Sequence, residues 1–440
     1  MTRGTVQPKR KFSETRVIST MKVAIVGAGW AGCAAAVEAM RLGHHITIFE
    51  ASRTAGGRAR RVMATVDGQQ IALDNGQHIL IGAYAETLRL MKEVGVDESA
   101  SFLRLPLTMQ FPDGSGLLLP DWPAPLDALA GILSARGWPL ADKLSLLKVA
   151  LGWRLGGFSC PPGESVSDLC SGLAPGPMAA LIEPLCVSAL NTPPERASGQ
   201  VFLRVMRDAL FAQSGGSNLL LPRTDLSALL PEAALAWLAA HGGAQRLGVR
   251  VQAVSPAGPG WRVDGEPFDR VVLACPPNEA ARLVQGSGVA TGAWMAQARG
   301  LEHEALATVY VSGASALLAQ PMLALHASAD EPAQFVFDRA QLGGPAGLLA
   351  FVISASTGDS ATLTAQVLAQ AARQLGLADL RPVQTIVEKR ATFACTPGLQ
   401  RPAQRIADGL LACGDYIAGP YPATLEGAVR SGLEAARSLR

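Results

Sequence analysis

The sequence has no cluster of metal-ligating residues and no paired cysteines. Its seven cysteines are scattered, their number is odd and no Cys-x-x-Cys pair occurs. This pattern favours a reducing compartment over a disulfide framework. The six histidines are equally dispersed, so we expect no metal site. An Asp-Asp-x-x-Asp cluster that could hold magnesium and a diphosphate is also missing.

Charge and aromatic side chains are scarce as well. Only 17% of the residues are charged, 5% are aromatic and the net charge is +2, so we expect no nucleic-acid partner. Hydrophobic residues make up 49% of the 440 residues, and the mean hydropathy is +0.22. The longest uncharged stretch, Ala305 to Ala329, contains Ser, Gln, Gly and Pro and is expected to form a buried strand and loop rather than a membrane span. Residues 1–20 contain no apolar core of a secretory signal, and we expect a disordered extension and a cytoplasmic protein.

A glycine-rich turn near the start carries the first functional signal. The apolar run Lys22 to Val26 predicts a buried strand, and an alanine-rich helix follows the turn. A second strand ends at Glu50, whose carboxylate suits the ribose hydroxyls of an ADP moiety. The first glycine permits the tight turn, the second lets the backbone approach a pyrophosphate and the third lets the helix pack closely. The expected binding residues of this unit are Gly27, Gly29, Trp30, Ala31, Gly32 and Glu50. At this point NAD and FAD remain open.

Two further turns favour FAD. Gly56 and Gly57 form a second flexible turn, and the guanidinium of Arg58 can pair with a phosphate. Near the C-terminus a strand runs into Gly414 and Asp415, and a helix follows. The N-terminus of that helix suits the pyrimidine edge of a flavin, which gains negative charge on reduction. Its expected contact residues are Ala423, Thr424 and Leu425.

With these motifs the chain resembles the flavin-dependent amine oxidase and phytoene desaturase superfamily. Within it, the interior motifs are similar to those of the hydroxysqualene dehydroxylase family of squalene-associated, FAD-dependent enzymes. The resemblance runs from about Met21 to the C-terminus and is carried by residues 74–84, 189–194, 219–226, 391–397 and 422–427. One departure is the stretch 415–421, where relatives usually carry Trp after the Asp, so we expect a flavin-facing wall of different shape.

The resemblance implies a fold and a set of site residues. The implied fold class is α/β: a Rossmann-like FAD-binding domain, with a parallel sheet and a glycine-rich turn, interleaved with an α+β substrate domain. It places Gly76, Gln77 and His78 near the flavin and the backbone of Val251 near the adenine. Candidate proton donors are His78, because histidine titrates near neutrality, and Tyr416. Tyr421 is a further candidate for the cavity wall or for a weak acid.

The expected domains are assembled by chain crossings. We expect the FAD-binding domain in residues 21–85, 216–277 and 389–440. We expect the substrate domain in residues 86–215 and 278–388. Residues 245–254 and 268–274 are strand-like runs of the first domain.

The implied activity is reductive dehydroxylation of hydroxysqualene to squalene in hopanoid or squalene biosynthesis. It needs non-covalently bound FAD, hydride from the reduced flavin, an electron donor for the flavin, and an apolar isoprenoid substrate. Cys413 is expected to lie inside a strand and to point away from the flavin. The oligomeric state stays open. A carotenoid-type desaturase shares the terminal motifs and remains an alternative. Two further alternatives are an amine oxidase and a non-catalytic prenyl-lipid carrier. The amine oxidase is disfavoured because no lysine lies between Lys148 and Lys389.

The segment from Leu117 to Gly157 predicts contact with a membrane surface. It carries Trp122, Trp138 and Trp153 among leucines and basic residues, which is a composition typical of membrane interfaces. Ordinary amphipathic helices that cover the substrate cavity are the alternative. A peripheral contact is expected to involve Trp138 and Trp153, and an apolar substrate would leave the bilayer there.

Overall fold

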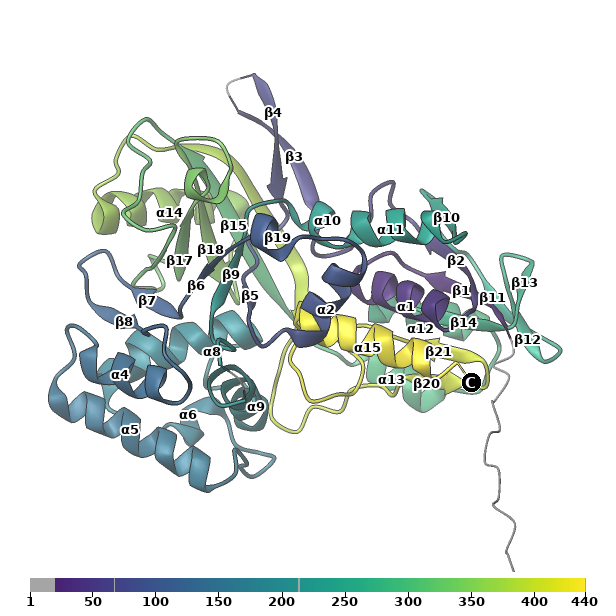
Figure 1. Ribbon diagram of the computed structural model, residues 1–440, viewed down its shortest axis with the longest axis horizontal. Coiled ribbons are helices and arrows are strands. Elements are labelled where there is room, and N and C mark those ends of the chain that lie inside the picture. Colours follow the sequence, from purple (N-terminus) through teal and green to yellow (C-terminus); the bar gives the residue numbers. More distant parts are fainter. Residues whose placement is uncertain (1–19, 67, 213, 440) are drawn as a thin grey trace, which may run out of the picture.

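The computed structural model describes residues 20–66, 68–212 and 214–439. The expected extension therefore lies outside the described residues except for Thr20. Two sheets occupy opposite parts of the elongated molecule, and helices cover them (Figure 1). Among the described residues, no helix combines the length and the apolar character that crossing a bilayer would require.

A six-stranded sheet forms one end of the molecule, with the strand order β10-β2-β1-β14-β21-β20. All neighbours are parallel except β20 and β21. The strands are β1 (Lys22–Val26), β2 (His45–Glu50), β10 (Ala244–Leu247), β14 (Arg270–Leu273), β20 (Arg405–Ala407) and β21 (Leu410–Ala412). The expected strand over 245–254 is wrong beyond Leu247, because Gly248 has a φ of +71° and ends it.

Both faces of this sheet are buried, as parallel sheets require. Val23 and Ile25 pack toward the helices α1 (Trp30–Arg41), α11 (Pro231–Ala240) and α15 (Leu425–Arg437). Ala24 and Val26 face the other side, which is covered by the next group of elements. These are β11 (Val254–Ala257), β12 (Gly260–Val263), β13 (Glu266–Phe268), α12 (Pro277–Gly286) and α13 (Gly292–Arg299).

A five-stranded antiparallel sheet, in the order β16-β17-β18-β15-β19, dominates the other part of the chain. Its strands are β15 (His303–Ser312), β16 (Met322–Ala324), β17 (Phe335–Asp338), β18 (Leu348–Ser354) and β19 (Arg381–Phe393). One face packs on α14 (Ser360–Leu375), and the other contributes Phe335 and Phe337 to the central core. The expected strand and loop over 305–329 are confirmed by β15 and β16.

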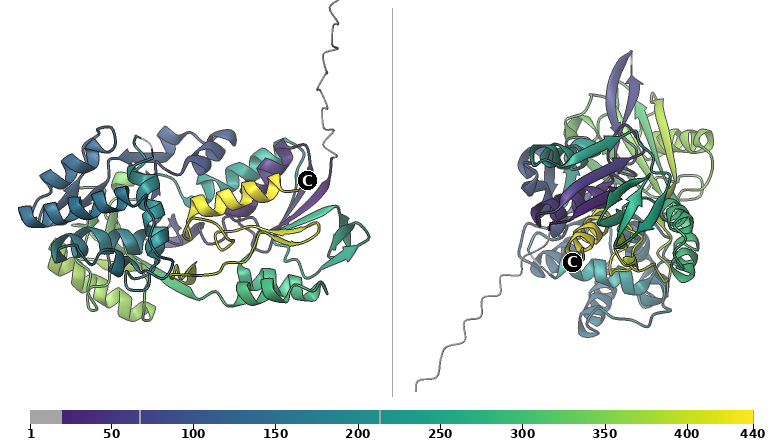
Figure 2. Two further views of the ribbon diagram at one scale, coloured as in Figure 1. Left: turned by 90° about the horizontal axis from the view of Figure 1, so that it is seen from below. Right: turned by 90° about the vertical axis from the view of Figure 1, so that its right-hand side faces the viewer.

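The remaining elements connect or flank the two sheets. The helices are α2 (Ala85–Glu93), α3 (Glu98–Ser101), α4 (Leu126–Ser134), α5 (Leu140–Leu155), α6 (Val166–Leu169), α7 (Pro175–Pro177), a π-helical turn (Met178–Ile182), α8 (Glu183–Leu190), α9 (Gly199–Leu210), α10 (Leu226–Leu229) and a 3-10 turn (Ala340–Leu342). The strands are β3 (Arg61–Val66), β4 (Gln69–Asp74), β5 (Leu80–Ile81), β6 (Phe102–Leu105), β7 (Thr108–Gln110), β8 (Gly116–Leu118) and β9 (Leu219–Pro222). The helices α4 and α5 lie at the end of the molecule opposite the six-stranded sheet (Figure 2). The expected domain boundaries stay a prediction.

Candidate functional site

A cavity of about 760 Å³ lies between the six-stranded sheet and the antiparallel sheet. Most residues that the sequence singles out line it, although they come from both ends of the chain. These are Gly27, Gly29, Trp30, Ala31, Glu50, Gly56, Gly57, Arg58, Gln77, His78, Val251, Gly414, Asp415, Tyr416, Ala423, Thr424 and Leu425. Gly32 and Gly76 do not line the cavity but lie behind its wall.

The glycines of the first turn are needed for different reasons. Gly27 has a φ of +116°, and a Cβ there would come within 2.6 Å of the Ala274 carbonyl oxygen. A Cβ on Gly32 would lie 1.9 Å from the Gly27 carbonyl oxygen, so this glycine lets α1 pack on β1. A Cβ on Gly29 would meet only the Cα of Gly57, at 3.9 Å. Gly29 therefore leaves space at the cavity, whereas Gly27 and Gly32 serve the fold.

Two helices begin at this cavity. The N-cap of α1 is Gly29, which has no side chain to occupy the first amides of the helix. The N-cap of α15 is Thr424, whose hydroxyl accepts a hydrogen bond from the Gly427 amide at 3.1 Å. Free amides and the helix dipole at both ends favour an anionic ligand. This geometry fits a pyrophosphate at α1 and a reduced flavin at α15.

Glu50 is fixed at the carboxyl end of β2. One carboxylate oxygen accepts the Ala28 amide at 2.8 Å, and the other accepts the Ser52 amide at 2.8 Å. The carboxylate thus borders the cavity beside the glycine turn, where an ADP ribose is expected.

Arg58 is already paired in this structure. Its guanidinium contacts the Asp415 carboxylate at 2.5 Å and donates to the Ala391 carbonyl at 2.8 Å. The sequence predicts a guanidinium that pairs with a phosphate. In the structure this guanidinium forms an ion pair with Asp415, which connects the Gly-Gly turn to the C-terminal loop. A cation beside a cavity needs a partner, and Asp415 provides one. A role in binding phosphate stays a prediction.

The Val251 segment has a second cation that the sequence analysis missed. Arg282 of α12 donates to the Val251 carbonyl at 2.9 Å and to the Gln252 carbonyl at 3.0 Å. Arg282 also lines the cavity. Val251 is buried beside it, and its proposed contact with adenine stays a prediction.

Two buried polar atoms in the cavity wall have no partner among the described residues. Gln77 accepts a hydrogen bond from Arg339 at 3.0 Å through its side-chain oxygen, which leaves its Nε2 unpaired. The Tyr416 hydroxyl is also unpaired, and burial raises the pKa of Tyr416 well above its ordinary value. Buried donors without partners are rare. Both groups therefore fit hydrogen-bonding contacts with a bound flavin or substrate.

His78 is neutral in this environment. Burial, followed by the nearby charge of Arg58, lowers the pKa of His78 to about 4. At neutral pH the imidazole carries one N–H and no additional proton, so it suits hydrogen bonding better than delivery of a proton as an imidazolium. Its catalytic role stays a prediction.

The far end of the cavity is apolar. Leu306 of β15, Phe335 and Phe337 of β17 and Val352 of β18 line it, together with Ala189 of α8. Among the described residues that line the cavity there is no lysine. The cavity thus joins a polar end that suits a dinucleotide to an apolar end that suits a hydrocarbon chain.

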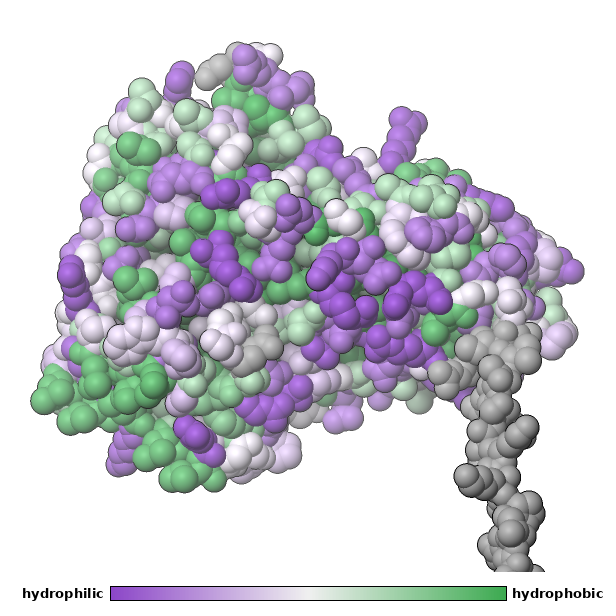
Figure 3. All heavy atoms as spheres, in the orientation of Figure 1, coloured by the Kyte–Doolittle hydropathy of each residue, from purple (hydrophilic) through white to green (hydrophobic). Residues whose placement is uncertain are grey.

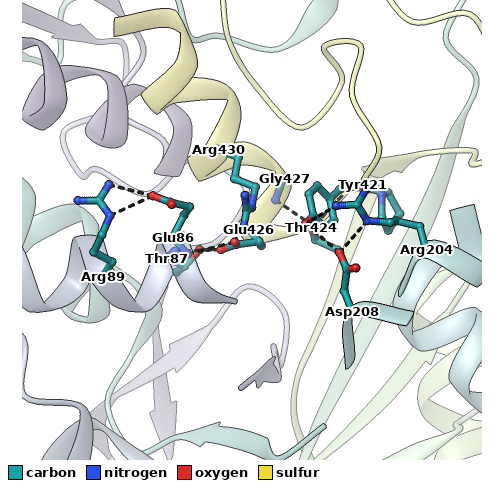
Figure 4. A network of polar contacts seen from close by, with 11 residues as sticks. Glu86, Thr87, Arg89, Arg204, Asp208, Tyr421, Thr424, Glu426, Gly427 and Arg430 are labelled. Carbon is teal, nitrogen blue, oxygen red and sulfur yellow. Dashed lines mark hydrogen bonds and ion pairs between the residues drawn. The ribbon is translucent and has the colours of Figure 1, made fainter. Parts of the chain in front are cut away.

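Tyr421 does not belong to this cavity, which corrects the expectation that it forms part of the wall. Its hydroxyl donates to Asp208 of α9 at 3.0 Å and accepts from Arg204 at 3.2 Å (Figure 4). The same network includes Glu426, which is almost fully buried and accepts the Thr87 amide at 2.9 Å. Arg204 and Asp208 therefore bind the loop before α15.

Cys413 directly follows β21, and its amide still donates to the Leu273 carbonyl at 2.9 Å, so it lies one residue past the end of the expected strand. Its side chain is buried in the core, as expected, and also borders the cavity. Cys275 lines the same cavity. Burial raises the pKa of Cys275 to about 12 and that of Cys413 still further. Both thiols are therefore protonated and poorly nucleophilic at neutral pH.

The buried carboxyl of Asp74, at the end of β4, should make the stability of the protein depend on pH. Burial raises its pKa from 3.8 to about 7, so the folded protein keeps a proton that the unfolded chain releases at lower pH. The contribution of this carboxyl is complete below about pH 4 and is lost as the pH rises through about 7. Asp74→Asn stays neutral, and its amide oxygen still accepts the Leu226 amide that Asp74 binds at 2.8 Å. We expect the melting temperature of this variant to exceed that of the wild type by more at about pH 8 than at about pH 5, whereas a constant difference would contradict the assignment.

Comparison with known proteins agrees with this geometry. Residues 30–440 match the model of the flavin containing amine oxidoreductase family. The chain is 30% identical to a hydroxysqualene dehydroxylase of Rhodopseudomonas palustris over 94% of this chain and 97% of that protein. It is 40% identical to a zeta-carotene desaturase of Zea mays, but over only 18% of this chain and 13% of that protein.

A solved oxidoreductase from Methanosarcina mazei has the same fold. It covers 95% of this chain and 100% of its own, with a TM-score of 0.73 and 16% identity. Together with the full-length sequence match, this confirms the expected α/β fold of the amine oxidase type. The chain belongs to the flavin-containing amine oxidoreductase family, within it to the hydroxysqualene dehydroxylases, and is an FAD-dependent oxidoreductase.

Proposed function

We propose that the protein reduces hydroxysqualene to squalene, as a step of squalene or hopanoid biosynthesis. The observation that carries the proposal is one cavity that joins a dinucleotide-binding end to an apolar end, in a chain that matches hydroxysqualene dehydroxylases over almost its whole length. The partial match to a carotene desaturase covers too little of the chain to support that alternative equally.

The reaction replaces a carbon–oxygen bond by a carbon–hydrogen bond. The hydroxyl takes up a proton and leaves as water, and the carbon receives a hydride. FAD, when bound and reduced, supplies that hydride, and an external electron donor restores it. The protein holds the two reactants together and keeps water out of an apolar space.

The residues present allow specific assignments. Glu50, Gly29 and the first amides of α1 would hold the ADP part of FAD. Gln77 Nε2 and the Tyr416 hydroxyl are the unpaired donors that would orient the flavin or the substrate hydroxyl. Because the Tyr416 hydroxyl is buried, protonated and without a partner among the described residues, Tyr416 is the better candidate for hydrogen bonding to the leaving oxygen.

The test is an anaerobic single-turnover experiment. The purified enzyme is photoreduced, mixed with detergent-dispersed hydroxysqualene and extracted for chromatography. We expect squalene to form as the flavin absorbance returns, with no squalene from oxidised enzyme. A reduced enzyme that leaves hydroxysqualene unchanged would contradict the proposal. Desaturated product from oxidised enzyme and a carotenoid precursor would favour the desaturase alternative.

We expect FAD to be bound without a covalent link. Cys275 and Cys413 line the cavity, but their raised thiol pKa values disfavour attack on the flavin. Acid precipitation should release the yellow colour into the supernatant, and Cys413→Ser should release it equally. Colour that remains with the wild-type pellet and is lost from the pellet of Cys413→Ser would show a covalent link.

We also propose that the protein is cytoplasmic and touches a membrane surface to collect its substrate. The apolar end of the cavity suits a substrate that resides in lipid, and no described helix could span a bilayer. Peripheral contact would give the apolar end of the cavity access to lipid without a helix that crosses the bilayer.

A further inference from the structure

Large apolar side chains are concentrated on the outer surface of α4 and α5. Of thirteen such side chains that are exposed among the described residues, nine lie between Leu118 and Leu155. Seven of them are leucines of these two helices, and we call this set the leucine face: Leu126, Leu129, Leu133, Leu140, Leu144, Leu151 and Leu155. Figure 3 shows apolar surface over this part of the molecule. Exposed apolar patches of this kind mark interaction surfaces.

The spacing of the leucines produces one stripe on each helix. In α5, Leu140, Leu144, Leu151 and Leu155 fall within an arc of about 60°, because 3.6 residues complete a turn. In α4, Leu126, Leu129 and Leu133 fall within a similar arc. Leu146 is buried on the opposite side of α5, and Ile132 is buried at the side of α4, about 90° from the middle of its stripe. Each helix thus has an inner apolar side for the fold and an outer one that the fold leaves uncovered.

The two helices are joined to each other and to the cavity wall. Lys143 of α5 donates to the Leu133 carbonyl at the end of α4, at 2.8 Å. The helix α5 packs on α7, which runs through the π-helical turn into α8. Ser188 and Ala189 of α8 line the apolar end of the cavity. The helices α7 and α8 and the π-helical turn between them therefore connect α5, which carries part of the leucine face, to the cavity wall.

Three of the exposed charges beside the leucine face are basic, and one, Asp121 before α4, is acidic. Arg136, Lys148 and Arg154 are exposed, whereas Asp127 is only 5% exposed and Asp142 is half-buried. On α5, Lys148 and Arg154 border the leucine stripe on opposite sides. An apolar stripe with basic borders matches an anionic lipid surface, in which leucines enter the acyl boundary and basic groups meet the headgroups. A second copy of the chain would bring these basic borders face to face.

We infer that the leucine face inserts into the surface of a bilayer that contains anionic lipid. The inference rests on the proposed function for its biological purpose, since a substrate dissolved in lipid would enter beside α8. Its structural evidence is the leucine face. The structure also revises the anchors expected from the sequence. Trp153 points inward and packs edge to face on Phe202 of α9, with ring centroids 6.1 Å apart. Trp138 is half-buried, whereas Trp122 before α4 is 55% exposed.

The test compares binding to vesicles. Flavin-loaded protein is sedimented with vesicles of phosphatidylglycerol and phosphatidylcholine and with vesicles of phosphatidylcholine alone. We expect wild type to bind the anionic vesicles, and the triple variant L144Q/L151Q/L155Q to bind at least about tenfold more weakly. The matched control is Leu317→Gln, because Leu317 is 72% exposed but lies outside the leucine face. K148Q/R154Q should lose most of the preference for anionic vesicles.

Each outcome decides the inference. All variants should keep their flavin and melting temperature, because the substituted side chains are exposed. Wild type that fails to bind anionic vesicles, or a triple variant that binds as well as Leu317→Gln, would overturn the inference. If light scattering shows that the wild type is a dimer and the triple variant a monomer, the leucine face binds a second copy of the chain instead. Activity on detergent-dispersed hydroxysqualene should be equal in wild type and triple variant, so its absence in both would reject the proposed function and leave the docking result standing.

Discussion

A Glu50→Ala variant should purify with little FAD. The carboxylate borders the cavity where the ribose is expected, and it also holds the amides of Ala28 and Ser52. Loss of one hydrogen bond to a charged group costs roughly 1.5–3 kcal/mol, which weakens binding about tenfold to a hundredfold. The ratio of flavin to protein absorbance after purification measures the effect, and titration of apoprotein with FAD gives the affinity.

Arg58→Ala should lose FAD by a comparable factor. Its guanidinium lies beside the Gly-Gly turn at the cavity, and its removal leaves the Asp415 carboxylate, which is 8% exposed, without its ion pair. An unpaired carboxylate in the cavity wall disfavours an anionic cofactor. Glu98→Ala is the control for both variants, because Glu98 is exposed and belongs to α3, which contributes no residue to the lining of the cavity. Full flavin occupancy in Glu50→Ala or Arg58→Ala would show that the residue concerned is misassigned.

Local motifs made the nucleotide-binding half of the site predictable. The strand, glycine turn and helix from Lys22 to Arg41 follow each other within twenty residues, and the backbone requires glycine at positions 27 and 32 of this turn. The same holds for Thr424, which caps α15 through its own side chain. Short-range patterns of this kind determine structure before any tertiary contact is considered.

Contacts between distant segments were not predictable in the same way. Arg339 holds Gln77 across 262 positions, and Arg58 meets Asp415 across 357. A single arginine within an apolar stretch signals that a buried partner exists, but it does not identify that partner. Arg204 and Asp208 illustrate the same limit, because on a helix they suggest a solvated surface until Tyr421 is brought against them.

Composition located the leucine face but not its orientation. The segment 117–157 combines tryptophan, leucine and basic residues, and the exposed leucines lie on two helices of this segment. Which side chains face outward depends on how α5 rotates against α7 and α9, and the large ring of Trp153 gains more from the core than from solvent. Leucines, which composition alone would assign to the core, therefore occupy the surface.

The sharpest separation of cofactor binding from folding is expected between Gly29→Ala and Gly32→Ala. At Gly29 the φ is −76°, which any residue adopts, and the added methyl would meet only the Gly57 Cα at 3.9 Å. The chain thus accommodates this alanine, while the methyl occupies space between the two glycine turns where a pyrophosphate is expected. We expect a protein with the melting temperature of the wild-type apoprotein and a strongly reduced affinity for FAD.

Gly32→Ala should fail for a different reason. Its methyl would lie 1.9 Å from the Gly27 carbonyl oxygen, so α1 must move away from β1 before the chain can fold. Because α1 packs against α15 and the central sheet, we expect a loss of several kcal/mol in stability, comparable to an overpacked core, and little soluble protein. Thermal unfolding of the two apoproteins, followed by FAD titration, distinguishes them. If Gly29→Ala binds FAD like the wild type, the pyrophosphate does not approach this turn, and if Gly32→Ala is as stable as Gly29→Ala, the close packing of α1 on β1 is not what this glycine provides.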